Sequence, residues 1–278
     1  MVKIGFFDRS VVETFLKITS AISVTLSLIV IFIDIPKERK GAFGFAFVAL
    51  LALIYLITWV WSNSLTKIDI NVEGSEVTIK VGDIFSQAGL KTIAFNEYFD
   101  TQVDDIIINE KSLNGIFLTT RLDVSVAELD RYIKNYAFES SDVLEDNLRR
   151  KIGKKMRYRL GTVCVYKDFI LTAFSRFDNA NKAILTMPEY LEFLINFWDK
   201  VNNVYGQKDL SAPIFGSGIT RIKGHKNIAD EDLLKIMLWT FRISEMRFKY
   251  PAKLTIVIHG DKIDKINLLG IKSAKNGM

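Results

Sequence analysis

The sequence has few of the residues that metal-stabilised or disulfide-stabilised proteins need. Its 278 residues include one cysteine, two histidines and four prolines. A single cysteine excludes an intrachain disulfide, so folding does not require an oxidising compartment. One cysteine and two histidines are also too few for a tetrahedral structural zinc site or a cysteine-ligated iron–sulfur cluster. We therefore expect no metal and no cofactor of these classes.

Charge of one sign is not in large excess either. The chain has 37 Lys and Arg against 32 Asp and Glu, which gives a net charge of +5. A nucleic-acid-binding domain usually has a larger and more clustered basic excess, so we expect no nucleic-acid partner. Hydrophobic residues make up 49% of the chain and charged residues 25%. The first value is too high for a disordered chain, and the second is too high for a protein embedded in a membrane throughout.

The apolar excess is concentrated near the start of the sequence. Residues 18–33 form an uncharged run of 16 residues, and residues 41–66 form one of 26. About 20 helical residues cross the hydrocarbon of a bilayer, so the second run is long enough alone and the first needs residues from its N-terminal side. Pro36 lies in the charged connection between the runs and stops a helix. The prediction is a transmembrane hairpin over residues 1–66, with helices at about 11–33 and 41–64.

Two other interpretations of these runs are open. A cleaved signal peptide would need a small-residue cleavage site after Ile33, which is missing, and a second apolar run follows directly. A pair of buried helices in a soluble core is disfavoured by the length of the second run. Basic residues flank the side of the termini slightly more than the connecting loop, which predicts cytoplasmic termini. We therefore expect a multi-pass membrane protein with a cytoplasmic soluble domain.

Small and aromatic residues on these runs indicate possible contacts. Thr19, Ser23 and Ser27 recur at four-residue spacing, and small faces let membrane helices approach closely. This face serves either packing within one hairpin or contact between protomers, and the second reading predicts a homo-oligomer on activation. Tyr55 and Trp59 lie toward the end of the second run, where an interfacial aromatic belt and membrane lipid are expected.

From residue 67 onward, short β-type runs alternate with amphipathic helical patterns. This alternation predicts a three-layer α/β domain with a mixed sheet, formed as one domain over residues 67–278. Capping-box patterns open two of the helices, at Ser125 and Thr186. The predicted helices start at Ser125, Ser141, Thr186 and Asp230, the second ending at Lys151. The predicted strands are 68–72, 77–81, 92–95, 105–108, 162–166, 169–174, 210–215 and 254–258.

Glycines follow two of the predicted strands, where an open α/β sheet binds ligands. Gly216-Ser217-Gly218 can form a backbone cradle for an anion, because glycine permits positive φ and close approach. Arg221 and Lys223 follow and would add charge-assisted bonds to a phosphate. After the strand ending at Val81, Asp83 can accept a hydrogen bond from an exocyclic amine. Taken alone, each segment is better explained as an ordinary turn.

Taken in order, these segments resemble a macro domain. The matching pieces are Gly82-Asp83-Ile84, the strand Thr92–Asn96, Ser112-Leu-Asn-Gly-Ile116 and Gly216-Ser217-Gly218-Ile219, and the resemblance covers about residues 68–272. It implies that Asp83 contacts adenine and that the glycine segments hold the diphosphate of an ADP-ribose derivative. The ligand-binding residues implied in this way are Asp83, Ile84, Asn96, Gly115, Ile116, Gly216, Ser217, Gly218, Ile219, Thr220 and Arg221.

A two-helix hairpin followed by a divergent macro-like domain resembles a narrower group, the transmembrane–macro effectors of type II Thoeris anti-phage defence. The segment 216–224 together with Asp230-Glu-Asp-Leu-Leu234 carries the most specific part of the match. The resemblance implies a non-enzymatic receptor. Its ligand would be an ADP-ribose conjugate, reported for the family as histidine-ADP-ribose, made by a partner TIR-domain enzyme. Ligand binding would lead to membrane disruption or cell arrest.

Two other functions remain open. A membrane-anchored ADP-ribosyl hydrolase would use Asn96 and Asp100, whereas a tethered scaffold would bind protein only. The glycines and polar residues of hydrolytic macro domains are missing after Asn96, where Glu97 follows. His225, His259 and Cys164 are interpreted as structural or surface residues. The basic run 149–157 is either a solvated face or a contact for anionic lipid or phosphate.

Overall fold

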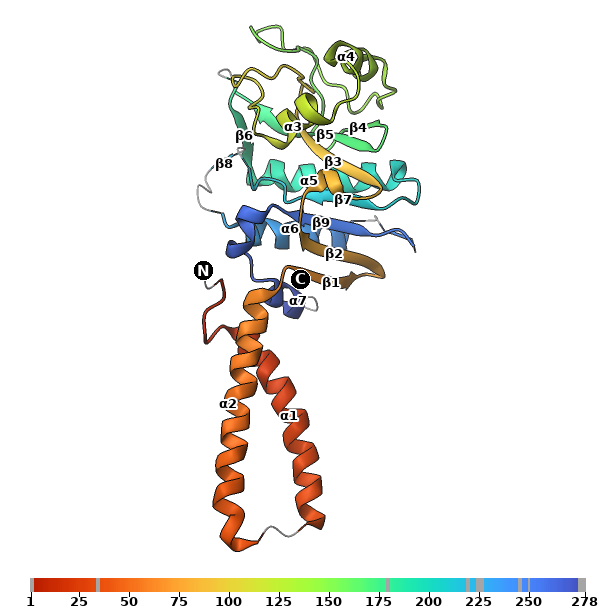
Figure 1. The fold of residues 1–278 in the computed structure, drawn as a ribbon. Coiled ribbons are helices and arrows are strands. Elements are labelled where there is room, and N and C mark those ends of the chain that lie inside the picture. The colour runs from red at the N-terminus through yellow and green to blue at the C-terminus, as the bar shows by residue number, and fades with distance from the viewer. Residues whose placement is uncertain are drawn as a thin grey trace. The chain divides into compact units, whose positions relative to one another are not determined.

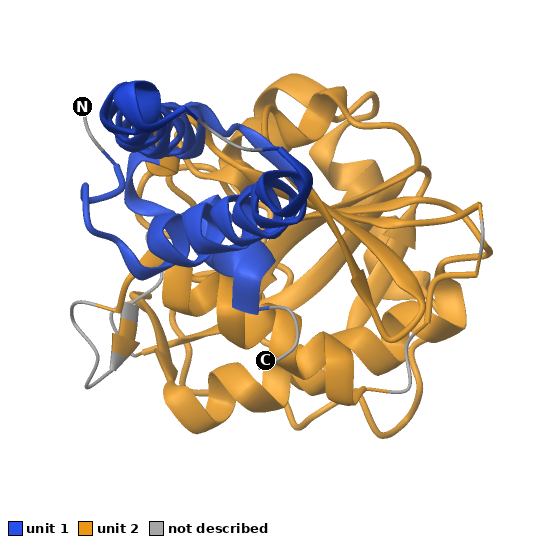
Figure 2. Cartoon of the chain, turned by 90° about the horizontal axis from the view of Figure 1, so that it is seen from below, with its two compact units in different colours: residues 1–68, 264–277 blue, residues 69–263, 278 orange. Residues whose placement is uncertain are grey.

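The computed structural model describes most of the chain, and it divides into two compact units. The described residues are 3–33, 36–178, 181–218, 221–223, 228–244, 247–249 and 251–274. One unit comprises residues 1–68 and 264–277, and the other comprises residues 69–263 and 278 (Figure 2). We call them the hairpin unit and the sheet unit. The sequence pattern predicted a hairpin ending at residue 66 and a macro-like domain over 67–278, whereas this division groups 264–277 with the hairpin.

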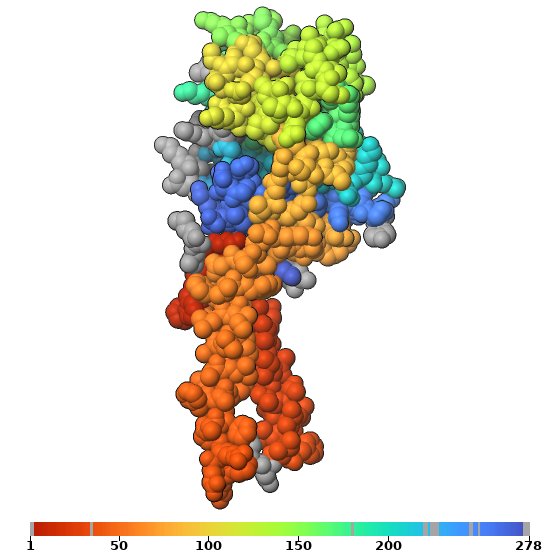
Figure 3. Space-filling model, viewed as in Figure 1, coloured from red at the N-terminus to blue at the C-terminus, as the bar shows by residue number. Residues whose placement is uncertain are grey.

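Two long helices make up most of the hairpin unit. Helix α1 (Arg9–Phe32) and helix α2 (Lys40–Ser64) run antiparallel, with a short 3-10 turn, η1 (Lys37–Arg39), before α2. Both helices are long and apolar enough to cross a membrane. They diverge toward their connecting loop (Figures 1 and 3). Large apolar side chains along them are exposed, among them Phe32 at 85% and Phe45 at 78%.

The other end of the hairpin unit has a small core of its own. Ile4, Val11 and Leu269 are buried together, and Tyr55, Trp59 and Leu65 pack against them. Leu269 belongs to helix α7 (Leu268–Ala274), so the end of the chain contributes to this core. The Trp59 indole Nε1–H donates to the carbonyl oxygen of Ile4 at 3.0 Å. We call this group of six residues the base cluster.

The sheet unit is built on a mixed sheet, as the sequence predicted. In the described part of the chain the strand order is β1-β2-β9-β7-β3-β5-β6-β8, with β4 paired to β5 (Figure 1). The pairs β2–β9, β9–β7, β7–β3, β3–β5 and β6–β8 are parallel, whereas β5 is antiparallel to β4 and β6. The strands are β1 (Lys67–Val72), β2 (Ser75–Val81), β3 (Leu90–Asn96), β4 (Val163–Tyr166), β5 (Phe169–Phe177), β6 (Ala183–Thr186), β7 (Leu210–Pro213), β8 (Arg221–Lys223) and β9 (Leu254–Ile258).

Alternating side chains of the central strands build a core on each face of the sheet. Phe95 and Leu171 join one buried cluster that includes Phe117 and Leu129 from the helices of that face. On the opposite face the ring of Phe174 packs against those of helix α5, with a centroid distance of 4.8 Å to Phe193. Successive strand residues point to opposite faces, so one helical layer covers each side. The helices are α3 (Leu113–Ile116), α4 (Val126–Asn135), α5 (Met187–Val204) and α6 (Asp230–Ile243), with the π-helical turn η3 (Phe117–Arg121) following α3.

The helix starts follow the local chemistry predicted from the sequence. Ser125 and Glu128 form a reciprocal capping box at α4, and Thr186 and Glu189 form one at α5. Each box satisfies backbone N–H groups that would otherwise lack partners. Helix α6 begins at Asp230 and has three acids in its first turn. Their negative charges interact favourably with the positive N-terminal end of the helix dipole.

Two predicted elements are wrong. Residues 105–108 form no strand beyond an isolated bridge, because Asp104 Oδ1 accepts hydrogen bonds from the amides of Ile106 and Ile107 and turns the chain. The segment 141–151 is not a helix. Its backbone pairs with the following residues, as in the bond from Leu144 N to the Arg157 oxygen at 2.8 Å. Tertiary contacts outweigh the helix propensity of this segment.

Candidate functional site

The parallel strands bring the predicted ligand segments to one edge of the sheet. Strands β2, β9 and β7 are neighbours, and the residues that follow β2 and β7 carry Asp83 and Gly216. The Gly82 N–H donates to the Ile258 carbonyl oxygen at 3.0 Å, which joins the exits of β2 and β9. Asn96 ends β3 at the same edge. This edge corresponds to the carboxyl ends of parallel strands, where α/β sheets bind ligands.

Asp83 opens a short turn after β2. Its carboxylate accepts hydrogen bonds from Phe85 N at 3.0 Å and Ser86 Oγ at 3.3 Å, and it caps the 3-10 turn η2 (Ile84–Ser86). The side chain remains 49% exposed, so its oxygens can accept a further bond. Ile84 is buried beneath the turn. The carboxylate is therefore held in place and remains accessible.

Arg121 approaches Asp83, which the sequence did not predict. Its guanidinium lies 3.8 Å from Asp83 Oδ2, and the side chain is 49% exposed. The same guanidinium lies over the Phe85 ring, 5.1 Å from its centroid. Arg121 ends η3, 38 positions after Asp83 in the chain, so no local motif links the two residues. This arginine adds positive charge beside the proposed adenine contact.

Gly115 lies where two backbone segments meet. A Cβ atom built on it would come within 2.2 Å of the Asn109 carbonyl oxygen. Its amide donates to Ser112 Oγ at 3.0 Å, so this amide already has a partner. Ile116 follows, half-buried. Packing alone therefore requires glycine at 115. Asn114 is buried, and no donor among the described residues reaches its Oδ1.

The turn after β7 has the backbone that a glycine cradle needs. Gly216 has φ of +83°, in the region that favours glycine, and a Cβ there would lie 3.4 Å from Leu233. Ser217 N–H donates to the Ile214 oxygen at 3.3 Å. At Gly218 no atom of the described residues lies within 4 Å of the Cβ position. Arg221 begins strand β8 and pairs with Ile184 of β6. Ile219 and Thr220, and also Gly224 and His225, lie outside the described residues.

Asn96 is part of a buried polar network rather than an open strand end. Its Nδ2 donates to Asp100 Oδ2 at 2.9 Å, and its Oδ1 accepts from Tyr98 N at 3.0 Å. Asp100 is 1% exposed and receives two bonds from the Arg150 guanidinium, at 3.1 and 2.7 Å. The backbone amide of Lys154 adds a third bond at 2.8 Å. Both candidate hydrolase groups are thus satisfied by the protein itself.

Glu97 is the centre of a second network. Its carboxylate is 3% exposed and lies 3.2 Å from both Arg157 and Arg176. Arg176 also bonds Glu189 Oε1 at 2.6 Å. Burial raises the pKa of Glu189, but hydrogen bonds from Thr186 and Arg176 outweigh burial and leave that pKa lowered. Arg150, Lys154 and Arg157 of the basic run therefore pair with acids inside this unit.

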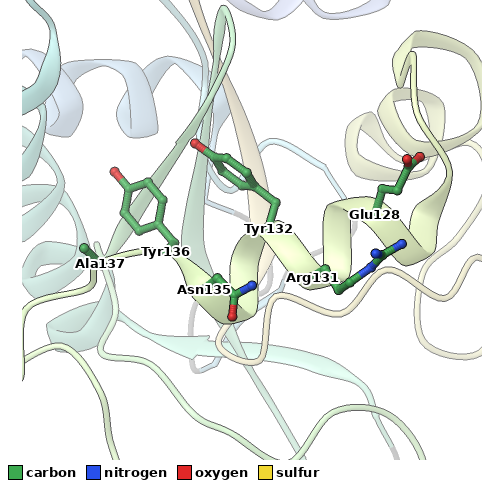
Figure 4. A pocket seen from close by; sticks show the side chains of 6 residues that line it. All are labelled: Glu128, Arg131, Tyr132, Asn135, Tyr136 and Ala137. Carbon is green, nitrogen blue, oxygen red and sulfur yellow. The ribbon is translucent and has the colours of Figure 1, made fainter.

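The described residues contain no cluster of three or more His, Cys, Asp and Glu side chains that could hold a metal ion. An open hollow of about 590 Å³ lies beside α4, lined by Glu128, Arg131, Tyr132, Asn135, Tyr136 and Ala137 (Figure 4). Its residues come from one helix and its end, and none follows a parallel strand. Burial raises the pKa of the Cys164 thiol to about 12, which fits an inert packed residue. We therefore place the candidate site at the carboxyl edge of the sheet.

Comparison with known proteins supports the resemblance drawn from the glycine segments. Residues 77–259 match the family model described as Thoeris protein ThsA, Macro domain. A Thoeris protein ThsA from Bacillus amyloliquefaciens (strain Y2) is 37% identical over 276 residues, covering 98% of this chain and 92% of the relative. Among solved structures, a mutant of the Oceanobacillus iheyensis macrodomain gives a TM-score of 0.44 at 14% identity, covering 77% of this chain and 97% of that one. The same macrodomain with ADP gives 0.41 at 13%, covering 76% and 95%.

The family match covers most of the sheet unit, and the curated relative extends over the hairpin unit as well. The resemblance to transmembrane–macro effectors is thereby confirmed. This chain belongs to the Thoeris ThsA family, and residues 77–259 are its macro domain.

Proposed function

We propose that this chain is a membrane-anchored defence effector whose macro domain binds an ADP-ribose-derived signal without consuming it. The placement of Asp83 and the Gly216–Gly218 turn carries this proposal. They follow β2 and β7, which flank a single strand, β9. An accessible carboxylate at one point and an open glycine backbone at the other match the adenine and the diphosphate of one nucleotide. Thoeris membership and the bound ADP named for a solved macrodomain agree with that ligand class.

The buried network around Asn96 favours a receptor over a hydrolase. A general base must reach the proton that it abstracts. Asp100 is instead enclosed, with both carboxylate oxygens bonded to Arg150. The Asn96 oxygen is likewise occupied by two backbone amides. This arrangement supports a role for the network in holding the residues after β3 rather than in turnover.

The hairpin unit supports membrane anchoring. Two antiparallel helices with exposed apolar side chains along their length are best stabilised by lipid, because water would solvate these side chains poorly. The proposal places the chain in the bacterial inner membrane as a multi-pass protein, with its macro domain in the cytoplasm. There a TIR-domain enzyme would supply the signal, in the form of histidine-ADP-ribose. Ligand binding would favour homo-oligomers of the hairpin that disrupt the membrane.

Calorimetric titration of the full chain in lipid nanodiscs tests the ligand. ADP-ribose and histidine-ADP-ribose are titrated in parallel, and each mixture is then analysed by chromatography. The proposal expects saturable binding, tighter for the conjugate, with both ligands recovered intact. Absence of binding to either ligand would contradict the macro-site assignment, and breakdown of the conjugate would identify a hydrolase instead.

Assembly needs a separate measurement in the membrane. The full chain is reconstituted in vesicles that contain a self-quenched dye, and histidine-ADP-ribose is added outside or inside. The proposal expects dye release together with higher oligomers on native gels, both dependent on the ligand. An Asp83→Ala chain serves as the matched control, because it keeps the hairpin intact. Leakage without ligand, or equal leakage from this variant, would contradict ligand control.

A further inference from the structure

Helix α7 connects the end of the chain to the start of α1. The Asn267 carboxamide nitrogen lies 3.2 Å from Asp8 Oδ1 and 3.1 Å from Ser10 Oγ. Asp8 is the N-cap of α1, so this bond reaches the residue that positions the helix. Leu269, the second residue of α7, is buried against Ile4 and Val11 in the base cluster. We call the contacts of Asn267 and Leu269 with these residues the C-terminal clasp.

The segment before the clasp begins at the candidate site. Ile258 ends β9, and its carbonyl accepts the hydrogen bond from Gly82, the residue before Asp83. Between Ile258 and Asn267 the chain forms a 3-10 turn, η4 (Gly260–Lys265). Only eight residues separate Ile258 from Asn267 in the sequence.

A second link ties η4 to the other side of the site. Lys262 Nζ lies 3.4 Å from Asp230 Oδ2, and the Asp230 side chain is only 10% exposed. Asp230 opens α6, the helix that follows the Gly216–Gly218 turn and β8 in the chain. The segment η4 is therefore tied to Gly82 through Ile258 and, through Lys262, to the start of α6, whose Leu233 lies beside Gly216. A flexible linker would not make such contacts with the rest of the unit.

We propose that η4 and α7 couple ligand binding at the sheet edge to the conformational order of the base cluster. The C-terminal clasp is the last contact in this connection. This inference rests on the proposed function, because it needs a ligand at that edge. A ligand that orders the exits of β2 and β7 restrains Ile258 and Lys262, and these restrain α7 in turn. Coupling of this kind between two sites commonly changes an equilibrium by about 5-fold to 150-fold.

Hydrogen exchange on the full chain in lipid nanodiscs, with and without ADP-ribose, tests the coupling. The main variant is Asn267→Asp. It keeps the oxygen that accepts from Gly270 N at 2.8 Å but replaces the donor facing Asp8 with a second carboxylate. Lys262→Ala removes the link at the other end of η4 and leaves α7 untouched. Lys272→Ala is the matched control, because Lys272 is an exposed residue of the same helix.

In the unmodified chain and in Lys272→Ala, ADP-ribose is expected to slow exchange at residues 82–86, 258–274 and 3–12, with the last segment slowed about fivefold or more. In both test variants the effect at 82–86 persists and the effect at 3–12 is lost. Slowing at 82–86 without any change at 3–12 in the unmodified chain would overturn the coupling alone, as would an effect at 3–12 that survives in both variants. Absence of any ligand effect, together with absence of calorimetric binding, would overturn the proposed function and the coupling with it.

Discussion

Arg150 and Asp100 form a bidentate ion pair across 50 positions of sequence, with N–O distances of 3.1 and 2.7 Å. The side chains are 5% and 1% exposed. The Arg150 guanidinium also lies 3.8 Å from the Tyr98 ring centroid. This pair holds the long segment after β3 in place within the sheet unit. It also engages the Asp100 carboxylate, which a hydrolase would have used.

Arg150→Ala is expected to destabilise the protein by about 3–5 kcal/mol, because it leaves the Asp100 charge buried without its partner. Denaturant unfolding followed by fluorescence measures the loss. Arg149→Ala is the matched control, since Arg149 is exposed, and its effect should stay within about 0.5 kcal/mol. Equal stability of the two variants would contradict the structural role of the pair.

Gly115→Ala and Gly218→Ala should distinguish a glycine that is needed for packing from one that is needed for ligand binding. Gly115→Ala places a Cβ 2.2 Å from a backbone oxygen and is expected to cost about 1–3 kcal/mol of unfolding free energy. Gly218→Ala meets no atom of the described residues within 4 Å, so its thermal midpoint should be unchanged. Its affinity for ADP-ribose should fall, because the diphosphate needs close backbone approach. A fully retained affinity would remove Gly218 from the site.

Asp83→Ala is expected to weaken ADP-ribose binding by about 10-fold to 100-fold, the usual effect of losing one hydrogen bond to a charged group. Because Asp83 is 49% exposed, the thermal midpoint should change little. Calorimetry and thermal scans of the same preparations provide both values. Glu110→Ala, an exposed acid of the same unit, should bind like the unmodified chain. Matching affinities for the two variants would contradict the adenine contact.

The Cys164 thiol should resist alkylation in the folded protein. Burial raises its pKa to about 12, so almost no thiolate forms at pH 8, and the side chain is fully buried. Mass spectrometry after treatment with iodoacetamide is expected to show no adduct in buffer and one adduct in denaturant. Rapid labelling of the native chain would place this thiol in an accessible position.

Glu189 should contribute to acid lability. Its folded pKa lies below the ordinary 4.5, because hydrogen bonds from Thr186 and Arg176 outweigh burial. A lowered pKa stabilises the fold above the unfolded value, and this stability is lost as pH falls through the folded value. The difference in unfolding free energy between the unmodified chain and Glu189→Gln should therefore shrink as pH falls below about 4.5. A difference that is constant across this range would contradict the shift.

Local signals in the sequence predict much of the fold. The Ser125 and Thr186 capping boxes and the continuous buried run of β9 depend on neighbours a few residues apart, and the structure has all three. The segment 141–151 could not be predicted this way. Its conformation depends on Arg150 reaching Asp100 and on backbone pairing with residues 155–158. Helix α7 was likewise missed, because its seven residues are held by contacts with α1 rather than by propensity.

In the candidate site too, local patterns were predictable from the sequence and contacts between distant residues were not. The glycines and Asp83 were predicted from a local pattern, a strand followed by a glycine turn, and their role as ligand contacts stays a prediction. Arg121 was missed, since only the fold brings it to Asp83. The basic run 149–157 appeared as one patch of charge in the sequence, but three of its side chains are paired with acids within the sheet unit. Sequence spacing cannot distinguish a free cation from one with a distant partner.

The position of the C-terminal clasp also has a consequence for biosynthesis. Because a chain is made from its N-terminus, α1 and α2 are synthesised and available for insertion long before Asn267 and Leu269 leave the ribosome. The base cluster is incomplete until these residues dock. A nascent or prematurely terminated chain thus carries the hairpin without its final contact.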